Sequence, residues 1–312
     1  MRICSLIPGA TEVIAALGLE QQLVGITHEC DFPPSVRRVP IMIESLVEGD
    51  HTTSAAIDQR VKELVAAGSP LYRLNEEAFH RAQPDLILIQ DLCHVCSVTP
   101  DQLSKAMQSL RRRPDLLTLS PTSVNDMIGD VERIAQAVGT PEQGKRLAAD
   151  LRHRLDRVRS QTEPRSRPRV VCLEWLDPLY VAGHWVPDMI DLAGGQDVLG
   201  SKGTPSQHTT WHDVEKAQPD VVVVIPCGYT IDRTIKELMR VGHAQEAWQR
   251  ATESWPDLYI VDAGSYFSRP GPRLVDGVEL LAAMLHPRHD QPIDPTKAIK
   301  LGASTLVGDR TP

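Results

Sequence analysis

Two segments of the chain carry the residue types that bind transition metals. Cys93-His94-Val95-Cys96 is a C-x-x-C motif with a histidine inside it, and His28-Glu29-Cys30 adds a second imidazole and a third thiol. Four nitrogen and sulfur ligands of this kind can form the tetrahedral site that zinc prefers. One hypothesis is therefore a zinc or iron site with a structural or catalytic purpose, formed by His28, Cys30, Cys93 and Cys96.

Other interpretations of the C-x-x-C motif stay open. A structural zinc site usually has two regular ligand pairs, and the His-x-Cys spacing of residues 28–30 is irregular. A redox-active motif usually begins a helix directly after a strand, whereas Val98-Thr99-Pro100 delays the helix here. Cys93 and Cys96 can also shape a loop as small, partly buried residues, or contact a bound ligand directly.

A second group of residues points to a large, flat and partly apolar ligand. The chain has only five tryptophans, five tyrosines and three phenylalanines, and eight of these lie in loops that we predict to face one crevice. Aromatic side chains offer a large contact area at low entropy cost, and tyrosine and tryptophan also keep a polar group. The eight are Phe32, Tyr72, Trp175, Trp185, Trp211, Tyr229, Tyr266 and Phe267.

Polar residues in the same predicted loops would orient such a ligand. A histidine (His28 or His94) or a cysteine would reach a metal at the centre of the ligand. The predicted polar contacts are His28, Cys30, Asp31, Arg73, Gln90, Asp91, Cys93, His94, Glu174, His184, His208 and Arg269.

Several other classes of function are disfavoured. Neither Ile7-Pro8-Gly9 nor Glu174-Trp175-Leu176 continues as the glycine-rich fingerprint of a nucleotide site, and no serine lies in a nucleophile elbow. The acids and histidines of the predicted crevice show no spacing that nominates an acid–base pair. The net charge is −8, and no apolar stretch approaches about 18 residues, so we expect neither nucleic-acid binding nor membrane insertion.

A repeated segment indicates how these loops are positioned. Gln83-Pro84-Asp85 leads into an aliphatic run, and Gln218-Pro219-Asp220 leads into another one 135 residues later. Runs of this kind are typical of strands buried on both faces of a parallel sheet. The repeat predicts two similar lobes, with ligand contacts in the loops that follow the strands, because open α/β sheets bind ligands at the carboxyl ends of their strands.

The fold that we expect is therefore α/β, with two Rossmann-like lobes whose sheets are mainly parallel. A long helix from Pro141 to about Arg159 joins the lobes, and the ligand cleft lies between them. A further helix is expected over 54–67. The predicted division is an N-terminal lobe (1–122), linking helices (123–165), a C-terminal lobe (166–290) and a loosely held tail (291–312).

The N-terminus and the cysteines bear on location. Met1-Arg2 runs directly into an apolar segment at residues 3–7, without the long apolar region of a secretion signal. The six cysteines form no compact disulfide framework. We therefore expect a cytoplasmic protein from the sequence as written, and a periplasmic protein if a leader has been trimmed.

Four stretches resemble the family of periplasmic binding proteins for cobalamin and iron-siderophores, the substrate-binding subunits of ABC importers. The cobalamin binders are the most similar branch. The stretches cover the opening strand and turn, the second strand with its ligand loop, the helix and strand before the cleft, and the closing helix. They are RICSLIPGATE (2–12), GITHECDFPP (25–34), LNEEAFHRAQPDLILI (74–89) and RPGPRLVDGVELLAAML (269–285).

The resemblance implies non-enzymatic binding of a cobalamin-like corrinoid, or another metal chelate, between lobes that close little. It also implies docking of one acid from each lobe onto an ABC permease: Glu76 or Glu77, and Asp213 or Glu215. Acids are favoured at helix N-termini by the helix dipole as well. The helix at 54–67 and the loop at 93–96 depart from the family pattern. The alternative function is a cytosolic metalloprotein that uses the Cys/His ligands named above.

Overall fold

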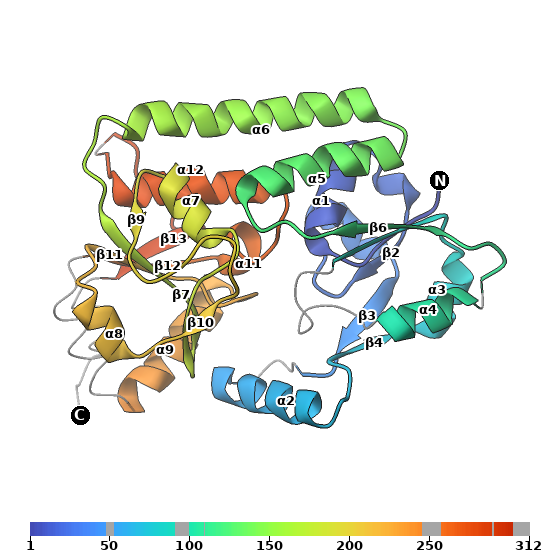
Figure 1. Cartoon of the computed structure of the whole chain (residues 1–312), viewed down its shortest axis with the longest axis horizontal. Coiled ribbons are helices and arrows are strands. Elements are labelled where there is room, and N and C mark those ends of the chain that lie inside the picture. The colour runs from blue at the N-terminus through green and yellow to red at the C-terminus, as the bar shows by residue number, and fades with distance from the viewer. Residues whose placement is uncertain (48–52, 91–99, 109, 245–256, 289, 302–312) are drawn as a thin grey trace.

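The computed structural model describes residues 1–47, 53–90, 100–108, 110–244, 257–288 and 290–301. Two α/β lobes lie side by side, and the helices α5 and α6 run along one side of the molecule from the N-terminal to the C-terminal lobe (Figure 1). The predicted two-lobe fold with a long joining helix is confirmed. In the described ranges, no helix combines the length and the apolar character that crossing a membrane needs.

The N-terminal lobe contains a six-stranded sheet in the order β4-β3-β2-β1-β5-β6, parallel except for the β3–β4 pair. Its strands are β1 (Ile3–Ser5), β2 (Leu23–Thr27), β3 (Ile41–Ser45), β4 (Tyr72–Leu74), β5 (Leu86–Gln90) and β6 (Asp115–Leu119). Its helices are α1 (Pro8–Ala16), α2 (Ser54–Ala66), α3 (Glu76–Ala82) and α4 (Pro100–Gln108), with the 3-10 turns η1 (Glu20–Gln22) and η2 (Pro34–Arg38).

The C-terminal lobe contains a seven-stranded sheet. The path is β10-β8-β7-β11-β12-β13, and β9 pairs with β7. The strands are β7 (Arg169–Leu176), β8 (Leu179–Val181), β9 (Gln196–Asp197), β10 (Gln207–His208), β11 (Val221–Val224), β12 (Asp257–Val261) and β13 (Ala298–Leu301). The helices are α7 (Val186–Leu192), α8 (Trp211–Lys216), α9 (Ile231–Ala244), α11 (Ala263–Tyr266) and α12 (Arg273–Leu285).

Two features of this sheet correct the sequence-based expectation. The strands β8 and β10 form an antiparallel extension beside β7 that was not predicted. In addition, β13 lies within the segment expected to be a loose tail, yet it pairs with β12 from Leu258 to Val261. The three strands β8, β10 and β13 are only two to four residues long, so they are too short for a periodic pattern to reveal.

The joining helices follow the predicted signals. Ser123 and Asp126 form a capping box at the start of α5 (Val124–Ala137), as expected. α6 (Pro141–Thr162) has 22 residues and therefore spans about 33 Å. A Cβ atom on Gly144 would lie 2.2 Å from the Cβ of Ala135, so only glycine permits this close approach of α6 to α5.

One hydrophobic cluster extends across both lobes, beside a smaller cluster within each lobe. A single cluster of buried side chains includes Ile3 and Val13 of the N-terminal lobe, Leu155 of α6, and Val223 and Leu281 of the C-terminal lobe. Because apolar packing is continuous from one lobe to the other through α5, α6 and α12, the lobes are held together by burial as well as by the chain connection.

The repeated Gln-Pro-Asp segment is an anchor at the amino ends of the strands. Gln83 and Gln218 both adopt left-handed backbone conformations, at φ 41° and 46°. The Asp85 carboxylate accepts a hydrogen bond from the Arg2 backbone N–H at 2.7 Å, and Asp220 accepts one from the Arg169 backbone at 2.8 Å.

The guanidinium of each arginine also donates to the end of the helix that lies directly before the Gln-Pro-Asp segment of its lobe. Arg2 Nε bonds the Ala82 carbonyl, and Arg169 bonds the carbonyls of Ala217 and Gln218. These carbonyls have no partner within their own helix, which is why a side-chain donor is favourable there. The repeat therefore ties the strands of each lobe together at their amino ends, which lie opposite the predicted ligand loops.

Candidate ligand-binding face between the lobes

The two lobes approach each other at the loops that follow their parallel strands. Asp31 lies in the loop after β2 and pairs with Arg269, which lies between α11 and α12. Glu29 Oε1 lies 3.9 Å from the position that a Cβ on Gly228, after β11, would occupy. Trp175 Nε1, near the end of β7, donates to the Ser54 carbonyl at 3.2 Å.

We call the residues at these approaches the interlobe face. It comprises Glu29, Asp31 and Phe32 of the N-terminal lobe, with His28 and Tyr72 beside them, and Trp175, Gly228 and Arg269 of the C-terminal lobe.

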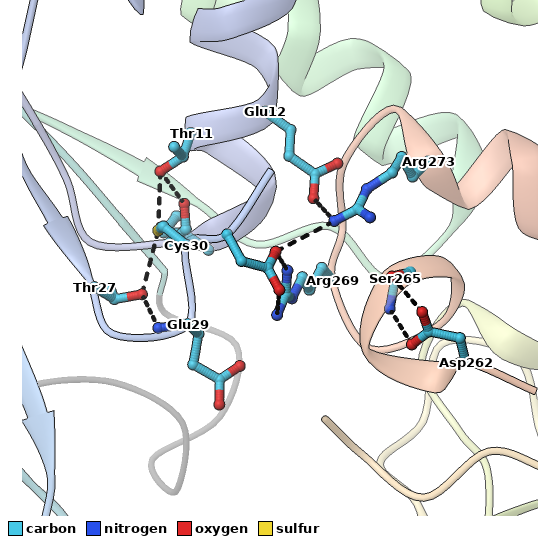
Figure 2. A network of polar contacts seen from close by, with 11 residues as sticks. Thr11, Glu12, Thr27, Glu29, Cys30, Asp262, Ser265, Arg269 and Arg273 are labelled. Atoms are coloured by element: carbon cyan, nitrogen blue, oxygen red, sulfur yellow. Dashed lines mark hydrogen bonds and ion pairs between the residues drawn. The ribbon is translucent and has the colours of Figure 1, made fainter. Parts of the chain in front are cut away.

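A network of charged side chains clamps the lobes at one end of this face (Figure 2). Arg269 bonds the Asp31 carboxylate through both terminal nitrogens, the second at 3.4 Å. Arg273 Nη2 lies 2.6 Å from Glu12 Oε1 and 3.7 Å from Asp31 Oδ1. The Arg273 guanidinium also lies over the Phe32 ring, 4.3 Å from its centroid. Two arginines of the C-terminal lobe thus hold two acids of the N-terminal lobe.

Burial shifts the pKa values of the charged groups in this clamp. Glu12 is 4% exposed, and burial raises the pKa of its carboxyl even though the hydrogen bond and the charge of Arg273 oppose the change. Burial alone would lower the pKa of Arg269, but the hydrogen bond and the charge of Asp31 outweigh it, so the pKa lies above its ordinary value. Each charge therefore depends on its partner across the lobes.

Close backbone packing supports the clamp. A Cβ on Gly9, in the first turn of α1, would lie 2.2 Å from the Pro270 carbonyl oxygen. Only glycine allows the segment between Arg269 and Arg273 to lie against the start of α1.

His28 is oriented so that one ring nitrogen faces away from the protein backbone. Its Nδ1 lies 3.0 Å from the Ile43 carbonyl oxygen. Because a carbonyl oxygen only accepts, Nδ1 carries the proton, and Nε2 keeps its lone pair in the neutral ring. Nε2 lies 3.9 Å from Glu29 Oε1, and the ring lies beside Tyr72 with centroids 6.1 Å apart. An imidazole held in this tautomer can ligate a metal through Nε2.

The C-terminal wall of the face is built around Trp175. The Trp175 ring meets the Tyr229 ring edge-on, with 5.4 Å between the centroids. The Arg233 guanidinium stacks on the Tyr229 ring, 3.8 Å from its centroid. Glu174 is turned toward its own lobe, where Oε2 accepts from Ser206 Oγ at 2.5 Å and from the Gly183 N–H at 3.4 Å. Trp175 is therefore the half-buried aromatic surface that this lobe presents.

Several predicted ligand contacts lie elsewhere. Arg73 pairs with Glu44 on the exposed side of β4 at 2.5 Å. His208 is exposed and meets Tyr180 edge-on at 5.6 Å. Tyr266 lies in α11, and its hydroxyl has a raised pKa because of burial and nearby acids. Gln90 ends β5 and is half-buried, whereas Asp91, Cys93, His94 and Cys96 lie outside the described residues.

Four aromatic predictions are corrected. Trp185, Trp211, Tyr229 and Phe267 are only 6, 7, 0 and 2% exposed, so their rings form part of the protein interior and not of an open ligand surface. Trp211 packs in the core of the C-terminal lobe. Trp185 Nε1 donates to the Phe267 carbonyl at 2.7 Å, which satisfies the one polar group of that ring inside the core. Of the eight predicted aromatics, Phe32, Tyr72 and Trp175 belong to the interlobe face.

Two of the four predicted metal ligands, His28 and Cys30, lie within the described residues, and Cys30 is buried. Its Sγ lies 3.1 Å from Thr11 Oγ1 and 3.3 Å from Thr27 Oγ1, inside the N-terminal lobe. Burial raises the pKa of this thiol, which disfavours the thiolate that a metal needs. Over the ranges that the structure describes, no three cysteine, histidine or acidic side chains are grouped as metal ligands.

The predicted docking acids lie at the ends of two helices far apart on the molecule (Figure 1). Glu76 and Glu77 occupy the exposed first turn of α3, where Glu77 pairs with Arg81 at 2.8 Å. Asp213 closes a capping box with Thr210 at the start of α8, and Glu215 is exposed on the same helix. Asp213 already satisfies the end of its own helix, so Glu215 is the less committed acid of that lobe.

Sequence reasoning missed Glu12 and Arg273 as parts of the clamp. Both lie in stretches that carry the family resemblance, but their pairing joins residues 261 positions apart, and no local pattern indicates it.

Comparison with known proteins agrees with this architecture. Residues 3–250 match the family model for periplasmic binding proteins. A vitamin B12-binding protein of Vibrio cholerae serotype O1 is 26% identical over 289 residues, which cover 91% of this chain and 88% of the relative.

Two solved structures have the same fold. The periplasmic vitamin B12 binding protein of Vibrio cholerae superimposes with a TM-score of 0.64 at 23% identity, over 91% of this chain and 96% of that one. The periplasmic heme-binding protein of Roseiflexus sp. RS-1 superimposes with a TM-score of 0.66 at 21% identity, over 91% and 97%. With two clamped α/β lobes, a long joining helix and a family match over most of its length, the chain belongs to the periplasmic binding protein family.

Proposed function

We propose that the chain binds a cobalamin-like corrinoid, or another flat metal chelate such as haem, at the interlobe face without changing it covalently. It would present this ligand to an ABC permease. The observation that carries the proposal is the similarity to vitamin B12-binding relatives across 91% of the chain. The geometry supports it, because loops of both lobes converge on one face with aromatic and imidazole groups.

Named residues have distinct tasks in this proposal. Trp175 from one lobe and Tyr72 from the other would cover the apolar parts of the macrocycle. His28 Nε2 would approach the metal, since Nδ1 is already committed to the Ile43 carbonyl. Glu76 or Glu77 of α3 and Glu215 of α8 would dock on the permease, one acid from each lobe.

The comparisons also support the periplasmic one of the two expected locations. The similar solved proteins from Vibrio cholerae and Roseiflexus are described as periplasmic. We propose the same location for this chain, where a binding subunit meets an importer.

Titration of the purified chain with cyanocobalamin, aquocobalamin and haem tests the proposal. We expect a dissociation constant below 100 µM, about −5.5 kcal/mol, for at least one of them by calorimetry. Failure of all three to bind at this level contradicts the proposal.

The role of His28 has its own spectroscopic test. If His28 Nε2 replaces the water of aquocobalamin, the visible spectrum shifts on binding. His28→Ala should bind without this shift. The matched control is His153→Ala, which removes an exposed histidine of α6 and should keep it. An identical shift in His28→Ala excludes His28 as the metal ligand.

A further inference from the structure

The helix α2 belongs to the N-terminal lobe but is hydrogen-bonded to the C-terminal lobe. Ser54, its first residue, donates from its backbone N–H to Glu237 Oε1 at 3.0 Å, and its hydroxyl donates to the same oxygen. The Ser54 carbonyl accepts from Trp175 Nε1 at 3.2 Å. Ser54 is fully buried, so solvent does not compete for these bonds.

Glu237 of α9 is suited to hold the start of α2. The first N–H groups of a helix have no partner within it, and a carboxylate is favoured there by the helix dipole. The Thr53 hydroxyl, in the same lobe, accepts a hydrogen bond from the Ala56 N–H at 2.9 Å. The Glu237 carboxylate, in the other lobe, accepts one from the Ser54 N–H. The second oxygen of Glu237 pairs with Arg240, and Glu237 is only 6% exposed.

The contact lies beside the aromatic wall of the interlobe face. α2 lies on the side of the molecule opposite α6 (Figure 1). Trp175 presents the C-terminal wall, and its indole N–H, the one polar group of this side chain, donates to α2. The Trp175–Ser54 bond and the Ser54–Glu237 bonds meet at one residue, so a ligand that enters beside Trp175 would meet the start of α2.

We propose that the Ser54–Glu237 contact is a latch that holds α2 across the interlobe face, and that Glu237 is a positioning residue for ligand entry. This inference rests on the proposed function. The latch keeps the ligand-free chain mostly closed, so only a fraction of molecules is competent to bind. The apparent affinity is reduced by that fraction. Weakening the latch raises the association rate and tightens binding by the same factor, with little change in dissociation.

The latch itself is tested without ligand, by hydrogen exchange of peptides that cover residues 53–60. Glu237→Ala should accelerate exchange of the first amides of α2 by about tenfold, because a hydrogen bond to a charged group is lost. Glu237→Gln keeps the size and one acceptor oxygen, so it should give a smaller acceleration. The control Glu63→Ala removes an exposed acid from the same helix and should leave exchange unchanged. Equal exchange in the wild-type chain and in both Glu237 variants overturns the latch.

The gating role is tested by stopped-flow binding of cyanocobalamin. We expect a several-fold faster association in Glu237→Ala, an intermediate rate in Glu237→Gln and the wild-type rate in Glu63→Ala. Faster hydrogen exchange with an unchanged association rate reduces Glu237 to a structural role and overturns the gating proposal. Failure of every variant to bind the cobalamins and haem contradicts the proposed function instead, and the exchange result then still decides whether the latch exists.

Discussion

The pair formed by Arg273 and Glu12 shows how strongly single residues tie the two lobes together. Both side chains are nearly sealed from solvent, at 13% and 4% exposed, and they come from opposite lobes. Breaking a buried ion pair by removing one partner leaves the other charge without compensation. The clamp is thus more costly to disrupt from one side than its hydrogen bonds suggest.

We expect Arg273→Ala to lower the free energy of unfolding by about 3–5 kcal/mol, because Glu12 then stays buried without its counter-charge. Arg152→Ala is the matched control. It breaks an exposed pair with Glu132 at 2.8 Å and should cost no more than about 1 kcal/mol. Urea denaturation followed by circular dichroism measures both. Equal losses in the two variants would mean that Glu12 is not dependent on Arg273.

Individual residues were predicted unevenly from the sequence. His28, Asp31, Phe32 and Trp175 follow predicted strands and lie at the interlobe face, together with Tyr72 of β4 and Arg269 before α12. Trp211 and Trp185 follow strand ends or turns as well, but they point into the core. A loop position fixes where a side chain starts and not which way it turns, so sequence alone could not separate these two groups.

At the scale of elements, the Gln-Pro-Asp repeat sets the start of a central strand in each lobe. Asp85 and Asp220 make the same bond to the backbone of the neighbouring strand, and the arginine of that strand bonds the preceding helix. The sequence repeat correctly indicated two similar lobes. Its chemical role is structural, because the anchor lies at the amino ends of the strands.

We expect Asp85→Ala and Asp220→Ala to cost similar amounts, each about 0.5–1.5 kcal/mol, since each removes one exposed hydrogen bond. The double variant should show the sum of the two, because the sites lie in different lobes and share no partner there. Asp150→Ala, an exposed acid of α6, should change stability by less than about 0.5 kcal/mol. Midpoints of urea denaturation compare the four variants with the wild-type chain. A strong inequality between the two single variants would contradict the equivalence of the anchors.

The helices of the chain were easier to predict than its short strands. α5 begins with a capping box, α6 begins with a proline, and both carry long apolar stripes that act over many residues. β13 has four residues and is held by pairing with β12, which precedes it by about forty positions in the chain. Pairing with a distant strand is a tertiary effect, so the segment appeared from the sequence alone to be a tail.

For the whole molecule, the clamp and the shared core predict limited movement between the lobes. Hinge-type binding proteins close around their ligands by rotation of whole domains. Here Arg269 and Arg273 already join the lobes without ligand, and apolar packing continues through α6. A movement of α2 alone would leave this frame in place.

We therefore expect small-angle X-ray scattering to give nearly the same radius of gyration with and without saturating cyanocobalamin. The reason is that the clamp and α6 both resist rotation of one lobe against the other. A chain with both Arg269→Ala and Arg273→Ala serves as the comparison, and it should change its radius more on binding. A clear contraction of the wild-type chain contradicts this expectation.

The length of the continuous helix α6 sets both the separation of the two lobes and the rotation of one lobe relative to the other. It is a single helix of 22 residues, so each inserted residue would lengthen it by about 1.5 Å and turn one lobe against the other by about 100°. Only insertions close to whole turns would keep the two sheets facing each other. The spacing of the lobes is therefore adjustable only in coarse steps, and adaptation to a larger or smaller ligand must take place in the loops.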